Sequence, residues 1–79
     1  MTNLEKYNEA FIQCFRVDVS ALTPSFSIET IEKWDSLAQM KLIAAIEEAF
    51  DILFDTDDII EFSSYENGIT ILSKYDIII

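Results

Sequence analysis

The segment SLAQMKLIAAIEEAF, residues 36–50, restricts the fold of this chain more than any other stretch. It contains no Gly or Pro, and its apolar residues recur at the spacing of an α-helix. The whole 79-residue chain has one Gly and one Pro, and 51% of its residues are hydrophobic. This composition favours helices that share one small core over strands or disorder. We therefore predict an all-α fold with one domain, residues 1–79.

Before this segment, the sequence predicts one helix and a long connection. The helix starts at Thr2, which forms a capping-box pattern with Glu5. Its expected apolar face contains Leu4, Tyr7, Phe11, Cys14 and Phe15. The helical pattern stops from Val17 to Asp35, a length that connections in compact domains rarely have without a reason. We expect its apolar side chains to hold it across the bundle: Val19, Leu22, Phe26, Ile28, Ile31 and Trp34.

After this segment, the sequence predicts two shorter helices. A third helix is expected near residues 56–62, after the turn DILFD. The fourth starts at Ser63 or Ser64, and Ser63 has capping-box spacing to Glu66. Gly68 lies inside this last helix, where it costs roughly 1 kcal/mol relative to Ala. We interpret Gly68 as the mark of a close contact between helices.

The helix at residues 36–50 has two apolar stripes, although a helix in a bundle needs only one. The expected inner stripe consists of Ala38, Leu42, Ala45, Ile46, Ala49 and Phe50. The outer stripe consists of Leu37, Met40 and Ala44, with Glu47 and Glu48 at its sides. This outer stripe is either a contact surface for a partner or a surface covered by the long loop.

The start of this helix offers two capping residues in succession, Asp35 and Ser36. Serine at such a position is ordinarily a cap, and Ser36 also has capping-box spacing to Gln39. If Asp35 caps the helix, however, the Ser36 hydroxyl is free and projects from the helix start. Free N–H groups and the positive end of the helix dipole lie there, and both suit a phosphate.

The charge of the chain limits its partners. Fifteen acids against five bases give a net charge of −10, which disfavours nucleic acid and anionic membranes and favours basic protein surfaces. We find no secretory signal and no apolar run of membrane-spanning length, so we expect a cytoplasmic protein. Without His, and with Cys14 as the one cysteine, no nucleophile and base pair can be assembled, so we predict that the chain is not an enzyme.

Seven acids and no base lie between residues 47 and 61. The stretch DTDD lacks the turn glycine and the bidentate Glu of a calcium loop, so we predict a solvated acidic face and no metal site. We also expect crowding to raise the folded pKa values of these carboxyl groups. The seven acids are Glu47, Glu48, Asp51, Asp55, Asp57, Asp58 and Glu61.

The sequence WDSLAQMKLIAAIEEAF resembles the signature of acyl carrier proteins and related carrier domains. The resemblance implies a four-helix bundle of acyl carrier type, with a long loop between helices one and two and a short third helix. It implies that Ser36 carries phosphopantetheine, which a phosphopantetheinyl transferase takes from coenzyme A, and that Asp35 and Leu37 help to form this site. It also implies that loading and transferring enzymes with basic docking surfaces contact Leu37, Met40, Ala44, Glu47 and Glu48.

Two departures from the family pattern affect the choice of partner. Trp34 stands where many members have Gly, and Ala38 and Lys41 stand where acidic carriers often have acids. We predict an acyl carrier of fatty acid or polyketide assembly that acts as a monomer and holds its load as a thioester. The alternatives are an aminoacyl or peptidyl carrier, and an acidic helical adaptor in which Ser36 is only a cap.

Overall fold

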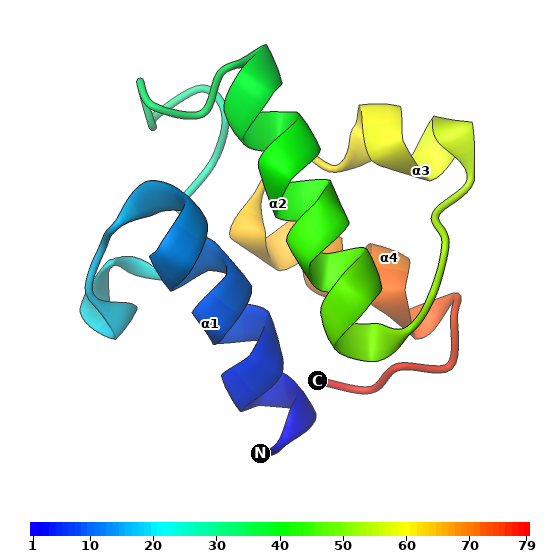
Figure 1. The fold of residues 1–79 in the computed structure, drawn as a ribbon. Helices are drawn as coiled ribbons and strands as arrows, with labels where there is room; N and C mark the ends of the chain where they lie inside the picture. Colours follow the sequence, from blue (N-terminus) through cyan, green and yellow to red (C-terminus); the bar gives the residue numbers. More distant parts are fainter.

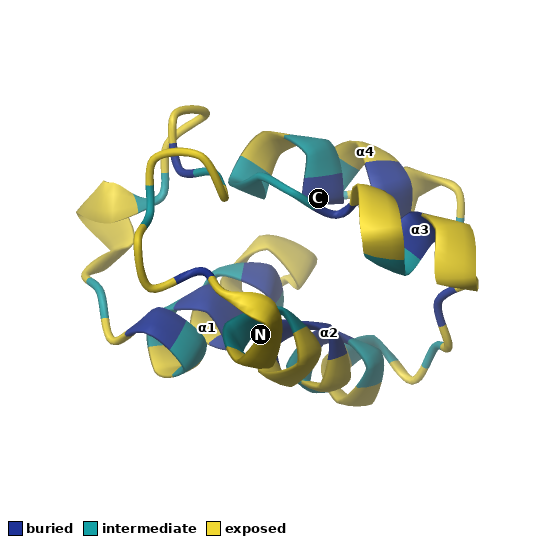
Figure 2. Ribbon diagram, turned by 90° about the horizontal axis from the view of Figure 1, so that it is seen from above, coloured by how far each residue is buried: buried dark blue, intermediate teal, exposed yellow.

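The computed structural model describes all 79 residues, which form four α-helices in two layers (Figure 1). In Figure 2, α1 and α2 form one layer, α3 and α4 form the other, and buried residues of both layers face each other. The elements are α1 (Asn3–Phe15), the 3-10 turn η1 (Val19–Ala21), α2 (Ser36–Phe50), α3 (Thr56–Glu61) and α4 (Tyr65–Ser73). The predicted all-α fold, with a long loop before α2 and a short third helix, is confirmed.

Local hydrogen bonds fix the helix starts. At α1 the predicted capping box is confirmed, because the Glu5 N–H donates to Thr2 Oγ1 and the Thr2 N–H donates to Glu5 Oε1. The prediction for α4 was wrong in one detail. Ser64 is the cap and its capping-box partner is Asn67, whose Oδ1 accepts from the N–H groups of both Ser63 and Ser64. The amide oxygen of Asn67 therefore accepts from two N–H groups, whereas the sequence predicted the carboxylate of Glu66 as the partner.

The core is largely aromatic and is centred on Phe11, which is fully buried. Leu4 was expected on this inner face but is 45% exposed, and Ala10 is buried instead. Edge-to-face and offset packing of aromatic rings adds stability beyond the area that they bury. The centroid of the Phe11 ring lies 5.0–6.3 Å from those of six others, Tyr7, Phe15, Phe26, Trp34, Phe62 and Tyr65.

Of the six apolar loop residues that were expected to pack on this core, two are buried. Phe26 and Trp34 are each 2% exposed, whereas Val19 and Ile28 are exposed, contrary to expectation. The loop also pairs with the segment before α4, because the Tyr65 N–H donates to the carbonyl of Phe26 at 2.9 Å. The loop therefore reaches the start of α2 along a fixed path.

The inner face of α2 differs from the predicted stripe. Leu42, Ile43 and Ile46 are its buried residues, whereas Ala49 is exposed. Ile43 is buried in addition to the predicted Leu42 and Ile46, so the buried arc lies to one side of the predicted stripe. Apolar residues lie nearly all around this helix, so periodicity alone could not locate the arc.

Candidate functional site

Of the two capping residues that the sequence offers, Asp35 caps α2 and Ser36 does not. The backbone of Asp35 is extended, and its Oδ1 atom accepts from the Ala38 N–H at 2.9 Å. The Asp35 carbonyl accepts from the Gln39 N–H, also at 2.9 Å, which closes the first helical turn. Ser36 is therefore the first residue of the helix, and its exposed hydroxyl makes no hydrogen bond within the chain.

This end of α2 can receive an anionic group. The N–H groups of Ser36 and Leu37 have no acceptor in the chain, as is usual for the first turn of a helix. They lie at the positive end of a fifteen-residue helix, which attracts phosphate. In Figure 1 this end lies at the opposite side of the molecule from both chain termini. The geometry thus combines a free hydroxyl with free amide donors.

A mainly apolar groove of about 500 Å³ opens beside Ser36. One wall comes from the loop at Ile28, and the other comes from α3. This groove could not be predicted from the sequence. Ile28 was expected to be buried, and Ile60, which is 74% exposed, has no periodic signal in so short a helix. The groove is lined by Ile28, Asp35, Ser36, Gln39, Met40, Ile59, Ile60 and Phe62.

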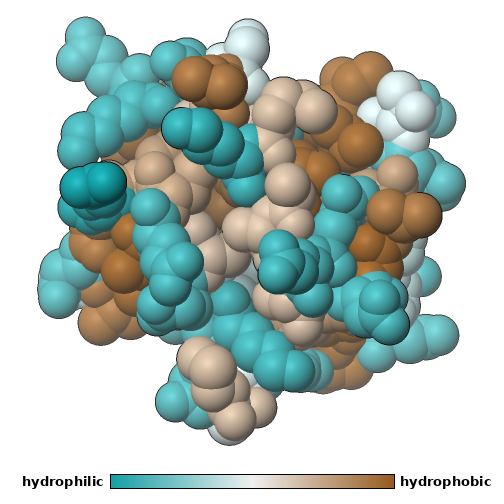
Figure 3. Space-filling model, in the orientation of Figure 1, coloured by the Kyte–Doolittle hydropathy of each residue, from teal (hydrophilic) through white to brown (hydrophobic).

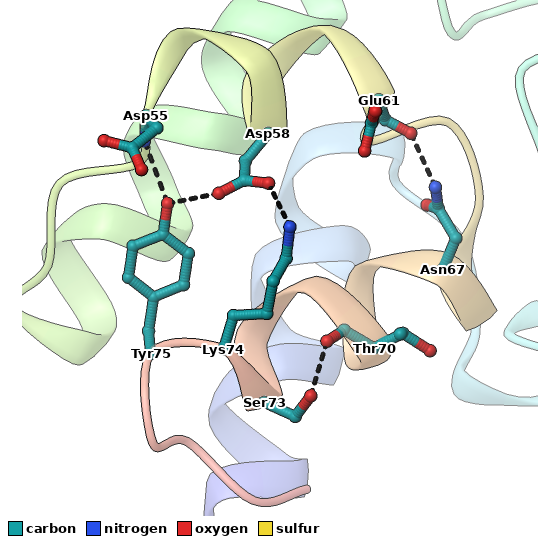
Figure 4. Close-up of polar contacts among 8 residues, drawn as sticks. All are labelled: Asp55, Asp58, Glu61, Asn67, Thr70, Ser73, Lys74 and Tyr75. Carbon is teal, nitrogen blue, oxygen red and sulfur yellow. Dashed lines mark hydrogen bonds and ion pairs between the residues drawn. The ribbon is translucent and has the colours of Figure 1, made fainter.

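The α3 wall is fastened to the end of α4 by the carboxylate of Asp58 (Figure 4). Its Oδ1 atom accepts from Lys74 Nζ at 2.7 Å, and its Oδ2 atom accepts from the Tyr75 hydroxyl. The same hydroxyl accepts from the Asp55 N–H at 2.9 Å. Asp58 is 6% exposed. The prediction that it belongs to a solvated acidic face is therefore wrong.

The expected rise in the pKa values of the clustered acids is wrong for Asp58. The hydrogen bond from Lys74 lowers the pKa of this carboxyl group, and the bond from Tyr75 lowers it further. The same contact raises the pKa of Lys74. The network therefore favours the charged forms of both side chains and stabilises the position of α3.

The predicted contact residues are mostly at the surface. Leu37 is 64% exposed and Met40 is 58% exposed, and Ala44 and Glu48 are exposed too, so the loop does not cover the outer stripe. In Figure 3 apolar side chains lie exposed along the middle of the face where α2 runs, with hydrophilic side chains on either side. Glu47 differs, because its Oε2 atom accepts from the Phe54 N–H at 2.9 Å. It holds the turn after α2 instead of projecting freely from the edge of the stripe.

Three other features of the molecule concern metal binding, membrane spans and thiol chemistry. No group of three or more His, Cys, Asp or Glu side chains is placed to hold a metal ion. None of the four helices has the length and apolar character needed to cross a membrane. Cys14 is half-buried, and burial raises the pKa of its thiol, which lowers the fraction of reactive thiolate.

Comparison with known proteins gave one match. The model of a protein family described as a phosphopantetheine attachment site matches residues 16–67, which is more than half of the chain. The matched range includes the loop, the whole of α2, the groove and α3. A search of curated proteins and a search of solved structures each found no match.

Proposed function

Because the chain belongs to the family of phosphopantetheine carrier domains, we propose that Ser36 is the residue that bears the phosphopantetheine group. Domains of this family carry the group covalently and are carriers, not catalysts. The group supplies a terminal thiol that holds a load as a thioester. The observation that carries the assignment to Ser36 is its free hydroxyl at the start of α2, where Asp35 has taken the capping role.

The attachment reaction needs an exposed serine oxygen and an anion site beside it. The Ser36 oxygen attacks the phosphorus that bears pantetheine in coenzyme A, and a new P–O bond forms. The bond from this phosphorus to the bridging oxygen breaks, and adenosine bisphosphate leaves with that oxygen. The hydroxyl proton passes to a base of the transferase. The free N–H groups of Ser36 and Leu37 are suited to the phosphodiester that results.

We infer further that the load is an acyl group. The groove beside Ser36 supports this choice because five of its eight lining residues are hydrophobic. An apolar chain that leaves water for this groove gains about 0.8 kcal/mol for each methylene that is buried. The small residues Ala44, Ala45 and Ala49 of α2 do not line this groove.

The exposed stripe on α2 supports a docking role. Leu37, Met40 and Ala44 would contact loading and transferring enzymes, and Glu48 would meet a basic side chain of the partner. Opposite charges across an interface chiefly raise the rate of encounter and make binding more selective for the correct partner. A tethered load also reaches the docked enzyme at a high effective concentration.

Intact-mass measurement with coenzyme A and a broad-specificity phosphopantetheinyl transferase tests the assignment. Wild type should gain one phosphopantetheine group, and Ser36→Ala should gain none. Ser25→Ala removes another exposed serine hydroxyl and should be modified like wild type. Modification of Ser36→Ala would overturn the site assignment. A wild-type chain left unmodified by several such transferases would favour an acidic adaptor in which Ser36 serves only the helix.

A further inference from the structure

The side chain of Gln39 joins three parts of the chain beside Ser36. Its Oε1 atom accepts a hydrogen bond from the Trp34 indole Nε1 at 2.6 Å. Its Nε2 atom donates to the carbonyls of Ile59 at 2.9 Å and Phe62 at 2.8 Å. The indole needs an acceptor and the carbonyls need donors, so only one orientation of this amide satisfies all three partners.

Both carbonyls belong to the end of α3, where helical carbonyls lack partners within the helix. Gln39 therefore serves as a cap for α3 that is supplied by α2. Asp58 is the one residue of α3 that is buried, and Ile60 is 74% exposed, so apolar packing holds this helix weakly. Polar bonds hold it instead: those of Asp58 near its start, and those of Gln39 together with the bond from Asn67 Nδ2 to the Glu61 carbonyl near its end (Figure 4).

The third bond reaches the entry to α2. Trp34 directly precedes the Asp35 cap and is 2% exposed, and its ring packs against those of Phe11 and Phe15. By holding Trp34, Gln39 fixes the backbone that leads into Asp35 and Ser36. One amide thus connects the start of α2 to the opposite wall of the groove.

We propose that Gln39 is a positioning residue for the modification of Ser36. It holds α3 and the start of α2 as one preformed surface for the transferase, and it does not touch the reacting atoms. This inference rests on the proposed function of Ser36. Loss of the bonds to α3 leaves the serine and its cap in place but lets the groove wall move. The enzyme must then select the ordered state, which raises KM and leaves kcat nearly unchanged.

The variant Gln39→Glu tests this because it keeps an oxygen acceptor for Trp34 and removes both donors to α3. The matched control is Gln13→Glu, which makes the same charge change at an exposed residue of α1. Kinetics of the transferase should show KM for Gln39→Glu raised about tenfold, or about 1.4 kcal/mol, with kcat within about twofold of wild type. Gln13→Glu should match wild type in both constants.

Spectroscopy separates a local effect from a loss of folding. Trp34 is the one tryptophan, so its indole N–H gives a single NMR signal. That signal should keep its hydrogen-bonded position in Gln39→Glu, while the Phe62 N–H, which donates to the Asp58 carbonyl, exchanges faster with solvent. Gln39→Met is the second variant, for use if a carboxylate at this position prevents folding. Methionine has a similar length and no charge, and we expect the same rise in KM.

A second control addresses global stability. Thr2→Ala removes the cap of α1 at the other side of the molecule and should leave KM unchanged. A KM that rises equally in Thr2→Ala, or that stays at the wild-type value in both Gln39 variants, would overturn the positioning role while leaving the Ser36 assignment intact. A wild-type chain that is never modified would instead overturn the proposed function, and this inference with it.

Discussion

The Nζ atom of Lys74, directly after α4, lies 2.7 Å from Oδ1 of Asp58 on α3. Lys74 is well exposed, so the ionic attraction alone is a weak force. The bond from the Tyr75 hydroxyl and the burial of Asp58 make the contact specific. This contact links the short third helix to the segment after α4, and protonation of Asp58 in acid would weaken it.

We predict that stability falls in acid through Asp58. Its folded pKa lies below the unfolded value of 3.8, so the folded state binds fewer protons at this group. The stabilising contribution is therefore present above about pH 3.8 and is lost as pH falls through the lower folded pKa. Melting temperatures of wild type and Asp58→Asn should differ at pH 7 and converge in strong acid.

This effect is opposite to the stabilisation by mild acid that raised pKa values of crowded carboxyl groups would produce. Glu5 and Asp18 also have lowered pKa values, because hydrogen bonds from Thr2 and Ser20 favour their charged forms. A melting temperature of wild type that rises steadily from pH 7 to pH 3 would contradict the prediction. The variant Glu66→Gln, at an exposed residue of α4, controls for the loss of one charge.

We predict that salt stabilises the fold at pH 7. The net charge of −10 on a compact domain produces repulsion that relaxes when the chain unfolds. Salt screens such repulsion over about 10 Å at 0.1 M. Melting temperatures should rise between a few millimolar and a few hundred millimolar sodium chloride, and magnesium chloride should act at lower concentration. A flat or falling series would mean that attractive pairs such as Lys74 with Asp58 outweigh the repulsion.

We predict that the two faces of α2 respond differently to truncation. Leu37→Ala and Met40→Ala should change the free energy of unfolding by no more than about 0.5 kcal/mol, because both side chains are exposed. Leu42→Ala should cost about 2–5 kcal/mol, because Leu42 is fully buried. Denaturant titrations give these values, and transferase assays should show slower modification of the first two variants. Equal stability losses in all three would contradict the division into two faces.

We predict that Gly68→Ala destabilises the protein, although alanine is the better helix former. A Cβ atom at this buried position would collide with Tyr7 Oη and Phe62 Cζ, which confirms the close contact expected from the sequence. Overpacking costs about 1–3 kcal/mol, against a helical gain of roughly 1 kcal/mol. Thr70→Ala, at an exposed residue of the same helix, should be neutral or slightly stabilising. A more stable Gly68→Ala would mean that the two rings move aside freely.

We predict that an acyl load contacts the groove. With an octanoyl group on the phosphopantetheine of Ser36, the methyl NMR signals of Ile59, Ile60 and Met40 should shift more than with a glycyl group. The methyl signal of Leu53, which is 82% exposed and lies outside the groove, is the internal control. Equal shifts with both loads would favour an aminoacyl carrier.

The sequence predicted those parts of the site that depend on neighbouring residues. Local spacing along one helix identified Asp35 and Ser36 as the two possible caps and separated Leu37 and Met40 from the inner face. The structure then shows that Asp35 is the cap and that Leu37 and Met40 are exposed. Gln39 was read only as a capping-box partner of Ser36, and its side chain is instead turned towards α3. Its partners Ile59 and Phe62 lie twenty or more residues away, so helical spacing could not reveal them.

The same limit explains the errors among the acids. Glu47 and Asp58 belong to a run that local charge density describes as solvated. Glu47, however, accepts a hydrogen bond from the Phe54 N–H in the turn after α2. Asp58 accepts from Lys74 and Tyr75, which come close to it only when the helices pack. Whether a charged side chain can be buried depends on such donors, and composition does not identify them.

The hydrogen bond from Asn3 Nδ2 to the carbonyl of Ile78, at 3.1 Å, brings the two ends of the fold together. A linker of a few residues would join these ends without stretching, and the exposed stretch from Thr23 to Ser25 offers a place for new ends. In such a circular permutant α2 would come first and α1 would follow α4. Ser36 would then lie close to the new amino terminus, with its cap and its groove still supplied by the same contacts. We therefore expect the groove beside this serine to depend on how the helices pack and not on the order in which the chain connects them.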